Sequence, residues 1–93
     1  MALTEAKYQS KIIKALEAKN WFCIKLISTN KNGIPDILAL KRDRKPLFIE
    51  VKGEKGRIAP LQEYRAKEVA SLGFLHHFAV SGDDFIDIIS ERY

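Results

Sequence analysis

The chain has 93 residues, near the lower end of the lengths that bury a self-sufficient core, so we expect one domain over residues 1–93. Its 16 Lys and Arg outnumber its 12 Asp and Glu, giving a formal net charge of +4. No apolar run approaches ~20 residues and the first segment mixes Lys with Glu, which excludes a membrane span and a signal peptide. A single cysteine, Cys23, excludes an internal disulfide and a Cys-x-x-Cys zinc site. We expect an intracellular, cytoplasmic protein with Cys23 as a small core residue.

The first predicted element is a helix. Thr4 is a typical N-cap, and the helix should run to about Lys19. On a helical wheel Glu5 falls within about 20° of Ile12 and Leu16, on the inward face. An acid in line with a buried stripe is unusual. Glu5 is therefore either part of a functional site or a residue that complements the helix dipole in the first turn.

Two strands should follow this helix. Residues 21–27 are rich in apolar residues typical of a strand, and residues 29–33 form a polar loop. Pro35 favours an extended residue before it and donates no hydrogen bond. The second strand is therefore predicted to begin at Asp36.

The second half of the chain predicts a mixed α/β arrangement. In order, we expect a hairpin connection (41–46), a nearly all-apolar central strand (47–52), a loop with two glycines (53–57), a helix (60–73), a strand (74–80) and a last helix (84–91). The resulting order αβββαβα predicts an α/β sandwich around a mixed sheet.

The two strands before the glycine-containing loop each carry a carboxylate. Asp36 and Glu50 stand fourteen residues apart, and Lys52 follows two residues after Glu50. Because strand side chains alternate, Glu50 and Lys52 project from one face, about 7 Å apart. A carboxylate within a buried strand is costly unless it is compensated, and a divalent cation shared with a second carboxylate would compensate it. The pattern predicts a metal site with a cationic neighbour, or else an ion pair of Lys52 with one acid.

These residues resemble the signature of the PD-(D/E)XK nuclease superfamily, in which Pro-Asp is followed after a spacer by Asp/Glu-any-Lys. The match here is Pro35-Asp36 with Glu50-Val51-Lys52. The resemblance implies a restriction-endonuclease-like αβββαβ core with a mixed central sheet flanked by helices. It also implies a Mg²⁺- or Mn²⁺-dependent endodeoxyribonuclease.

The neighbouring residues are similar to those of one compact subgroup, the virus-type replication-repair nucleases (VRR-NUC). Gly33 precedes the Pro-Asp pair, and Pro60-Leu61-Gln62 opens the helix after the lysine. The resemblance extends from about residue 5 to residue 80. It departs at Ala59, where the subgroup commonly carries a Ser or Thr helix cap.

The resemblance also implies roles for single residues. Asp36 and Glu50 would be metal ligands, and Val51 would add its backbone carbonyl. Lys52 would orient or deprotonate the attacking water and offset charge in the transition state. Glu5 resembles a first-helix glutamate that supplements the metal shell in relatives acting on branched DNA. Gln62 would hydrogen-bond the metal-bound water or the phosphate, or would be a solvated helix residue.

Positive charge surrounds the carboxylates. Residues 41–57 contain seven Lys and Arg against three acids, whereas residues 83–93 contain one Arg against four acids. This distribution suits a polyanionic partner. Lys55 and Arg57, on the glycine-flanked loop, are candidate contacts to a DNA backbone. Lys41 and Arg42 are either further contacts or part of a solvated hairpin tip.

We expect the working unit to be a homodimer, because one site cuts one strand and symmetric cutting needs two copies. The resemblance implies that the substrate is branched or Holliday-junction DNA, and we expect a protein of phage or bacterial type. A self-complementary apolar patch is predicted at Trp21, Phe22, Phe85, Ile86, Ile88 and Ile89. The alternatives are a flap or replication-associated nuclease, and a non-catalytic nucleic-acid-binding module of the same fold. The intact set of acids and lysine argues against the last of these.

Overall fold

The computed structural model describes residues 4–53, 56–79 and 82–93. Three helices and four strands follow in the predicted order: α1 (Glu5–Glu17), β1 (Phe22–Lys25), β2 (Ile37–Leu40), β3 (Leu47–Val51), α2 (Pro60–Ser71), β4 (Leu75–Ala79) and α3 (Gly82–Arg92). The sheet order is β1-β2-β3-β4, so β3 is an internal strand as expected. The first two pairings are antiparallel and β3 pairs with β4 in parallel. The sheet is therefore mixed, and the predicted restriction-endonuclease-like core is confirmed.

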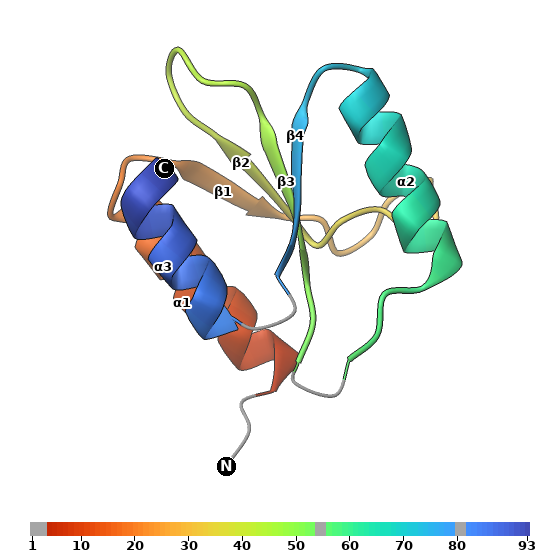
Figure 1. Cartoon of the computed structure of the whole chain (residues 1–93), viewed down its shortest axis with the longest axis horizontal. Coiled ribbons are helices and arrows are strands. Elements are labelled where there is room, and N and C mark those ends of the chain that lie inside the picture. The colour runs from red at the N-terminus through yellow and green to blue at the C-terminus, as the bar shows by residue number, and fades with distance from the viewer. Residues whose placement is uncertain (1–3, 54–55, 80–81) are drawn as a thin grey trace.

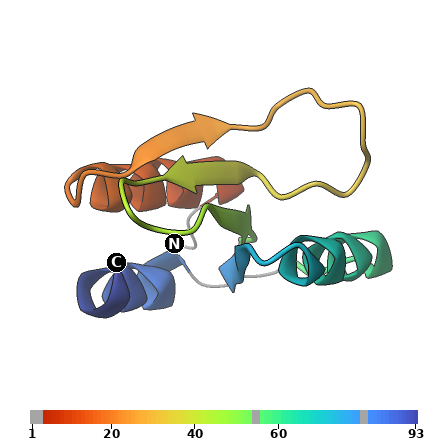
Figure 2. The same cartoon turned by 90° about the horizontal axis from the view of Figure 1, so that it is seen from above.

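The helices cover the two faces of the sheet unequally. Figure 1 shows α1 and α3 together on one side of the sheet and α2 on the other. The long loop between β1 and β2 extends beside α2, as the view from above makes clear (Figure 2). One face of the sheet thus carries two helices, and the other carries one helix and one loop.

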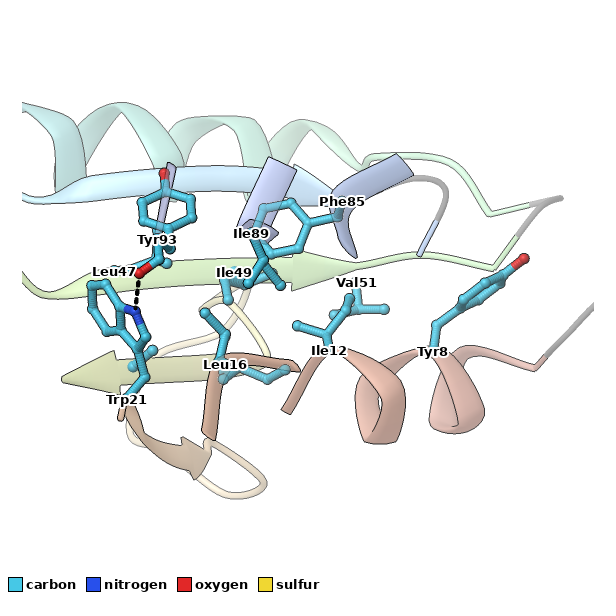
Figure 3. Close-up of a cluster of buried hydrophobic side chains, with 12 residues drawn as sticks. Tyr8, Ile12, Leu16, Trp21, Leu47, Ile49, Val51, Phe85, Ile89 and Tyr93 are labelled. Carbon is cyan, nitrogen blue, oxygen red and sulfur yellow. Dashed lines mark hydrogen bonds between the residues drawn. The ribbon is translucent and has the colours of Figure 1, made fainter. Parts of the chain in front are cut away.

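The core lies between the sheet and the pair α1 and α3. Tyr8, Ile12 and Leu16 form the buried stripe of α1, with Thr4 as the expected N-cap accepting from the N–H of Lys7 at 3.2 Å. From the sheet and α3 this cluster receives Trp21, Ile37, Ala39, Leu47, Ile49, Val51, Phe85, Ile89 and Tyr93 (Figure 3).

The proposed self-complementary patch is wrong for most of its residues. Trp21 is 2 % exposed, Phe85 2 % and Ile89 1 %, so they seal the chain's own core. Trp21 meets Tyr93 edge to face at 5.8 Å, and its indole N–H donates to the Tyr93 carbonyl at 3.4 Å (Figure 3). Ile88 is partly buried against the same core, and Ile86 is half-buried. Phe22 is the exposed member of the set, at 67 %. Composition alone shows that α3 is apolar but not whether its apolar side chains pack against the chain's own core or a second copy.

Two other expectations concern Cys23 and the helix ends. Cys23 packs partly buried against the core, where burial raises the pKa of its thiol to about 11, with Glu17 adding to the shift. It is therefore a packing residue, since a reactive thiol needs a lowered pKa.

The first helix ends earlier than predicted, because Asn20 takes a left-handed conformation (φ 70°) as the chain turns into β1. None of the described helices has the length and apolar character needed to cross a bilayer.

Candidate active site

The side chains of strand β3 point alternately into the core and toward the candidate site. Leu47, Ile49 and Val51 point into the core, so Phe48 and Glu50 point to the opposite face, the one that carries α2. Glu50 is only 2 % exposed and is the one buried charged side chain among the residues that the structure describes. A carboxylate in this position must have a compensating partner.

Asp36 ties the end of β2 to the end of β3. Its Oδ2 accepts a hydrogen bond from the Val51 N–H at 2.8 Å, and its main-chain carbonyl accepts from Leu26 N–H at 2.8 Å. The side chain thus takes the place of a main-chain partner for Val51. Strand β2 accordingly begins at Ile37 rather than at the predicted Asp36.

Pro35 explains why a side chain takes that place. Ile37 pairs with Ile49, so the same register continued by two residues sets Pro35 opposite Val51. The N–H and C=O of one strand residue point to the same side, so the Val51 carbonyl also faces this neighbour. Proline has no N–H to offer it. Pro35 therefore cannot supply the ladder donor that another residue at this position would offer to the Val51 carbonyl.

The two carboxyl groups interact directly. The pKa of Glu50 is raised from 4.5 to about 8, first by burial, then by a side-chain hydrogen bond with Asp36 and by the negative charge of Asp36. Lys52 lowers this pKa and Glu5 raises it further, but both effects are smaller. Glu50 therefore keeps its proton at neutral pH, because burial and the neighbouring Asp36 carboxylate disfavour its charged form.

This arrangement fits a divalent cation. Two adjoining carboxyl groups and a main-chain carbonyl oxygen are the hard oxygen ligands that Mg²⁺ and Mn²⁺ take, and a cation would replace the proton on Glu50. No group of three or more His, Cys, Asp or Glu side chains with metal-binding geometry occurs within residues 4–53, 56–79 and 82–93. A cation held by so few protein ligands would keep several waters, which is the usual state of Mg²⁺ in proteins.

Lys52 follows Glu50 beyond the end of β3, half-buried and close enough to lower the pKa of Glu50. Its aliphatic stem lies against Gly56. A Cβ added to Gly56 would stand 3.0 Å from the Lys52 Cβ and 3.2 Å from its Cδ. A turn closed by the Gly56 N–H and the Gly53 carbonyl, at 2.9 Å, brings this glycine back onto the lysine. The two loop glycines were visible in the sequence, but this contact was not.

Two other predicted site residues have different surroundings. Gln62 Oε1 accepts a hydrogen bond from the Ala59 N–H at 2.8 Å, so the glutamine caps α2 at the position where Ala59 has no capping side chain of its own. Glu5 is exposed in the first turn of α1 and acts on Glu50 through its charge. The structure does not gather Glu5 into a three-carboxylate cluster with Asp36 and Glu50.

The predicted DNA contacts are divided between the two ends of the sheet. Lys41 follows the end of β2 that lies opposite to Asp36. Its ammonium group is 5.8 Å from the Trp21 ring centre and donates to the Tyr93 carbonyl at 3.3 Å. Arg42 is exposed next to it. Arg57 is exposed in the loop after Gly56, and Lys55 lies outside the described residues. Lys41 therefore lies at the edge of the hydrophobic core, against Trp21 and Tyr93, and not beside the carboxyl groups of Asp36 and Glu50.

Comparison with known proteins agrees with this geometry. A model of the VRR-NUC domain matches residues 2–81. The chain belongs to the VRR-NUC family. A solved structure described as a VRR-NUC domain is similar to it with a TM-score of 0.83 and 25 % identity, over 98 % of this chain and 99 % of that one. A search of curated proteins found no match.

Membership in the VRR-NUC family makes the chain a nuclease domain of the PD-(D/E)XK type, for which DNA is the substrate and a divalent metal the general cofactor. The match covers the elements that position Asp36, Glu50 and Lys52. The carboxyl groups of Asp36 and Glu50 in this VRR-NUC domain thus lie at the adjoining ends of β2 and β3, within the residues that the family model matches.

Proposed function

We propose that this VRR-NUC domain is a Mg²⁺- or Mn²⁺-dependent endodeoxyribonuclease that cuts branched DNA, including four-way junctions, as a homodimer. One observation supports the catalytic part above all others. The buried Glu50 carboxyl shares a hydrogen bond with Asp36 while Lys52 stands beside it, an arrangement that is costly for the fold and is explained by a cation and a phosphate.

Each residue has a distinct task in this proposal. Asp36, Glu50 and the Val51 carbonyl would hold the cation, which supplies charge neutralisation at the phosphate and an acidified water. Asp36 keeps its second oxygen for this task, because the Val51 N–H occupies Oδ2. Lys52 orients the attacking water and offsets negative charge in the transition state. Gln62 would reach the phosphate or the water through its amide nitrogen, since its oxygen caps α2.

The proposed catalytic role is tested by incubating labelled linear, flap, splayed and four-way-junction DNA with the chain, with and without Mg²⁺ or Mn²⁺. Cleavage should require the metal and be strongest on the junction. Asp36→Ala, Glu50→Ala and Lys52→Ala should each abolish it without unfolding the protein. Metal-dependent cutting of flaps alone would replace junctions as the substrate. Binding without cutting under all conditions would leave a non-catalytic module.

The supporting observation for the dimer is a bare apolar area on edge strand β1. Phe22 is 67 % exposed, its cross-strand partner Leu40 is 36 % exposed, and Ile24 on the same face is 38 % exposed. Edge strands with exposed apolar residues favour association. A two-fold pair would also carry two sites, as paired incision of a junction requires.

Light scattering tests this pairing. The parent should give a mass of about twice 10.6 kDa, and Phe22→Lys should reduce it to that of one chain. Leu72→Lys is the matched control, since Leu72 is 70 % exposed and is the C-cap residue of α2. A parent that stays monomeric yet makes paired symmetric cuts would overturn the dimer.

A further inference from the structure

A polar recess of about 380 Å³ lies inside the loop that connects β1 to β2, and Asp36 forms part of its wall. The loop begins after β1 and returns to the sheet where the Leu26 N–H bonds to the Asp36 carbonyl, at 2.8 Å. The catalytic carboxylate and the recess therefore adjoin. The roles assigned above to the metal ligands and to Lys52 leave this recess unused.

The side chains around the recess suit an anion. Ser28 contributes a hydroxyl group, Asn32 an amide and Lys31 an ammonium group. Asp36 is the one acid among the lining residues. Lys31 is exposed, and within the part of the chain that the structure describes no ion pair engages it. Ammonium, hydroxyl and amide donors are the groups that proteins direct at DNA phosphates.

The recess is held in shape before any ligand arrives. The Thr29 hydroxyl donates to the Lys31 carbonyl at 2.8 Å and accepts from the Lys31 N–H at 3.4 Å, which fixes the bend that carries the lysine. Such local closure lowers the entropic cost of binding.

Helix α2 supports the loop from outside. Arg65 Nε donates to the Asn32 carbonyl at 2.9 Å, and Glu68 holds Arg65 at 2.8 Å. Gly33, with φ of 76°, lies so close to α2 that an added Cβ would stand 2.6 Å from the Leu61 Cγ. Figure 2 shows the loop extended on the same side of the molecule as this helix. The loop is thus docked on α2, which is itself the helix that faces Glu50's side of the sheet.

We propose that this recess binds the DNA phosphate next to the scissile one, with Lys31 as its cationic contact. The inference rests on the proposed nuclease function. A DNA strand whose scissile phosphate lies at Asp36 and Glu50 must continue past Asp36, and Asp36 forms part of the wall of the recess. The volume is within the range of sites that hold a ligand the size of a nucleotide. The loop then fixes which way the strand runs through the site.

The test determines whether Lys31 contacts one particular phosphate of the DNA strand. DNA substrates are made with a single neutral methylphosphonate at each position around the mapped cleavage point. Binding is measured in a Glu50→Gln background so that the strand stays whole, with Lys31→Ala added, or with Lys67→Ala as the matched control. Lys67 is an exposed lysine on α2 that does not line the recess.

Lys31→Ala should weaken binding to unmodified DNA by about three- to tenfold and lower the salt slope by about 0.7 to 0.9, as expected for one lost phosphate contact. The neutral linkage next to the cleaved bond should weaken the parent by a similar factor and Lys31→Ala no further. Lys67→Ala should respond to every neutral linkage as the parent does. The proposal would be overturned if, at every position, the loss of affinity caused by Lys31→Ala added to the loss caused by the neutral linkage.

Two further outcomes separate the recess from the catalytic proposal. If the chain cuts no DNA, the neutral linkages are placed along the whole strand. Coupling between Lys31 and one phosphate in binding would then keep the recess as a site for a strand phosphate, while the nuclease mechanism falls. If the chain cuts DNA and Lys31→Ala behaves like Lys67→Ala, the recess falls and the nuclease stands. Titration with inorganic phosphate and a free mononucleotide distinguishes a strand subsite from a site for free anions. Tight binding of either, with no strand coupling, would assign the recess to a free anion and overturn the proposal.

Discussion

The two faces of strand β3 differ in almost every respect although they alternate along the same five residues. On one face Leu47, Ile49 and Val51 are completely buried under α1 and α3. On the other face Glu50 is buried without enough countercharge, and an apolar groove of about 380 Å³ between Phe48 and α2 remains open. The residues on the core face stabilise the fold. Burial of the Glu50 carboxyl group on the other face lowers that stability, and the fold alone does not need this group.

This division has a simple structural cause. Two helices cover the core face, whereas a single helix and a loop cover the other (Figures 1 and 2). The incompletely covered face is where a long polyanion could approach Glu50, Lys52 and the recess at Lys31. Substitutions on the two faces should therefore separate stability from cleavage.

The largest effect is expected on the core face. Ile49→Ala removes a side chain that is 0 % exposed, and we expect it to cost about 2–5 kcal/mol of the free energy of unfolding. Urea denaturation measures the loss. Where the protein remains folded, its metal requirement for cleavage should be unchanged. A loss below about 1 kcal/mol would mean that the core face is not the source of stability.

The next effect tests the cost of the buried acid. With its pKa raised to about 8 by burial and by Asp36, Glu50 keeps its proton in the folded state over a pH range in which the unfolded chain has already released it, since the ordinary value is 4.5. The folded state then binds more protons, so the metal-free stability should fall as pH rises from about 4.5 to about 8. The loss should be on the order of a few kcal/mol.

Glu50→Gln should remove this pH dependence and abolish cleavage at the same time. Thermal unfolding in EDTA across that pH range provides the measurement. Adding Mg²⁺ at pH 8 should stabilise the parent and not the variant. Equal pH profiles for parent and variant would contradict the view that Glu50 destabilises the metal-free fold.

Much of this division was predictable from sequence because it depends on alternation. The period of two along residues 47–52 put Glu50 and Lys52 on one face, together with Phe48, and Pro35 placed Asp36 near a strand end. Element order followed from the same local patterns, and the ends of the helices and strands were off by at most two residues.

The rest depended on contacts between segments far apart in the chain. Nothing local in α3 distinguishes Phe85 and Ile89 as core residues from the same residues as a dimer patch, because both require an apolar face. The Gln62 bond to the Ala59 N–H is the exception, since a missing Ser or Thr cap was visible in the sequence. A glutamine three residues after an uncapped position was a signal of this local role.

A third and smaller effect concerns the contact between Gly56 and Lys52. Gly56→Ala should lower the cleavage rate about tenfold with little change in substrate affinity, because a methyl group 3.0 Å from the Lys52 Cβ displaces the lysine. Gly73→Ala is the control: its φ of 89° strains an alanine, but nothing lies within 4 Å. It should cost about 1 kcal/mol of stability and leave the rate unchanged. Similar rates for the two variants would show that Gly56 does not position Lys52.

The smallest effect distinguishes the two ends of the sheet. Lys41→Met keeps the aliphatic stem against Trp21 but removes the charge over the ring and the hydrogen bond to the Tyr93 carbonyl. We expect a loss of about 0.5–1 kcal/mol of stability, because each of these contacts is partly exposed. DNA affinity and its salt slope should stay at the parent values, since the ammonium group is already engaged away from Asp36. Lys31→Met should show the reverse pattern, with unchanged stability and weaker binding. If Lys41→Met instead lowers the salt slope by about one phosphate contact, the bound DNA must reach the far end of β2, and the open face of the sheet is not its main path.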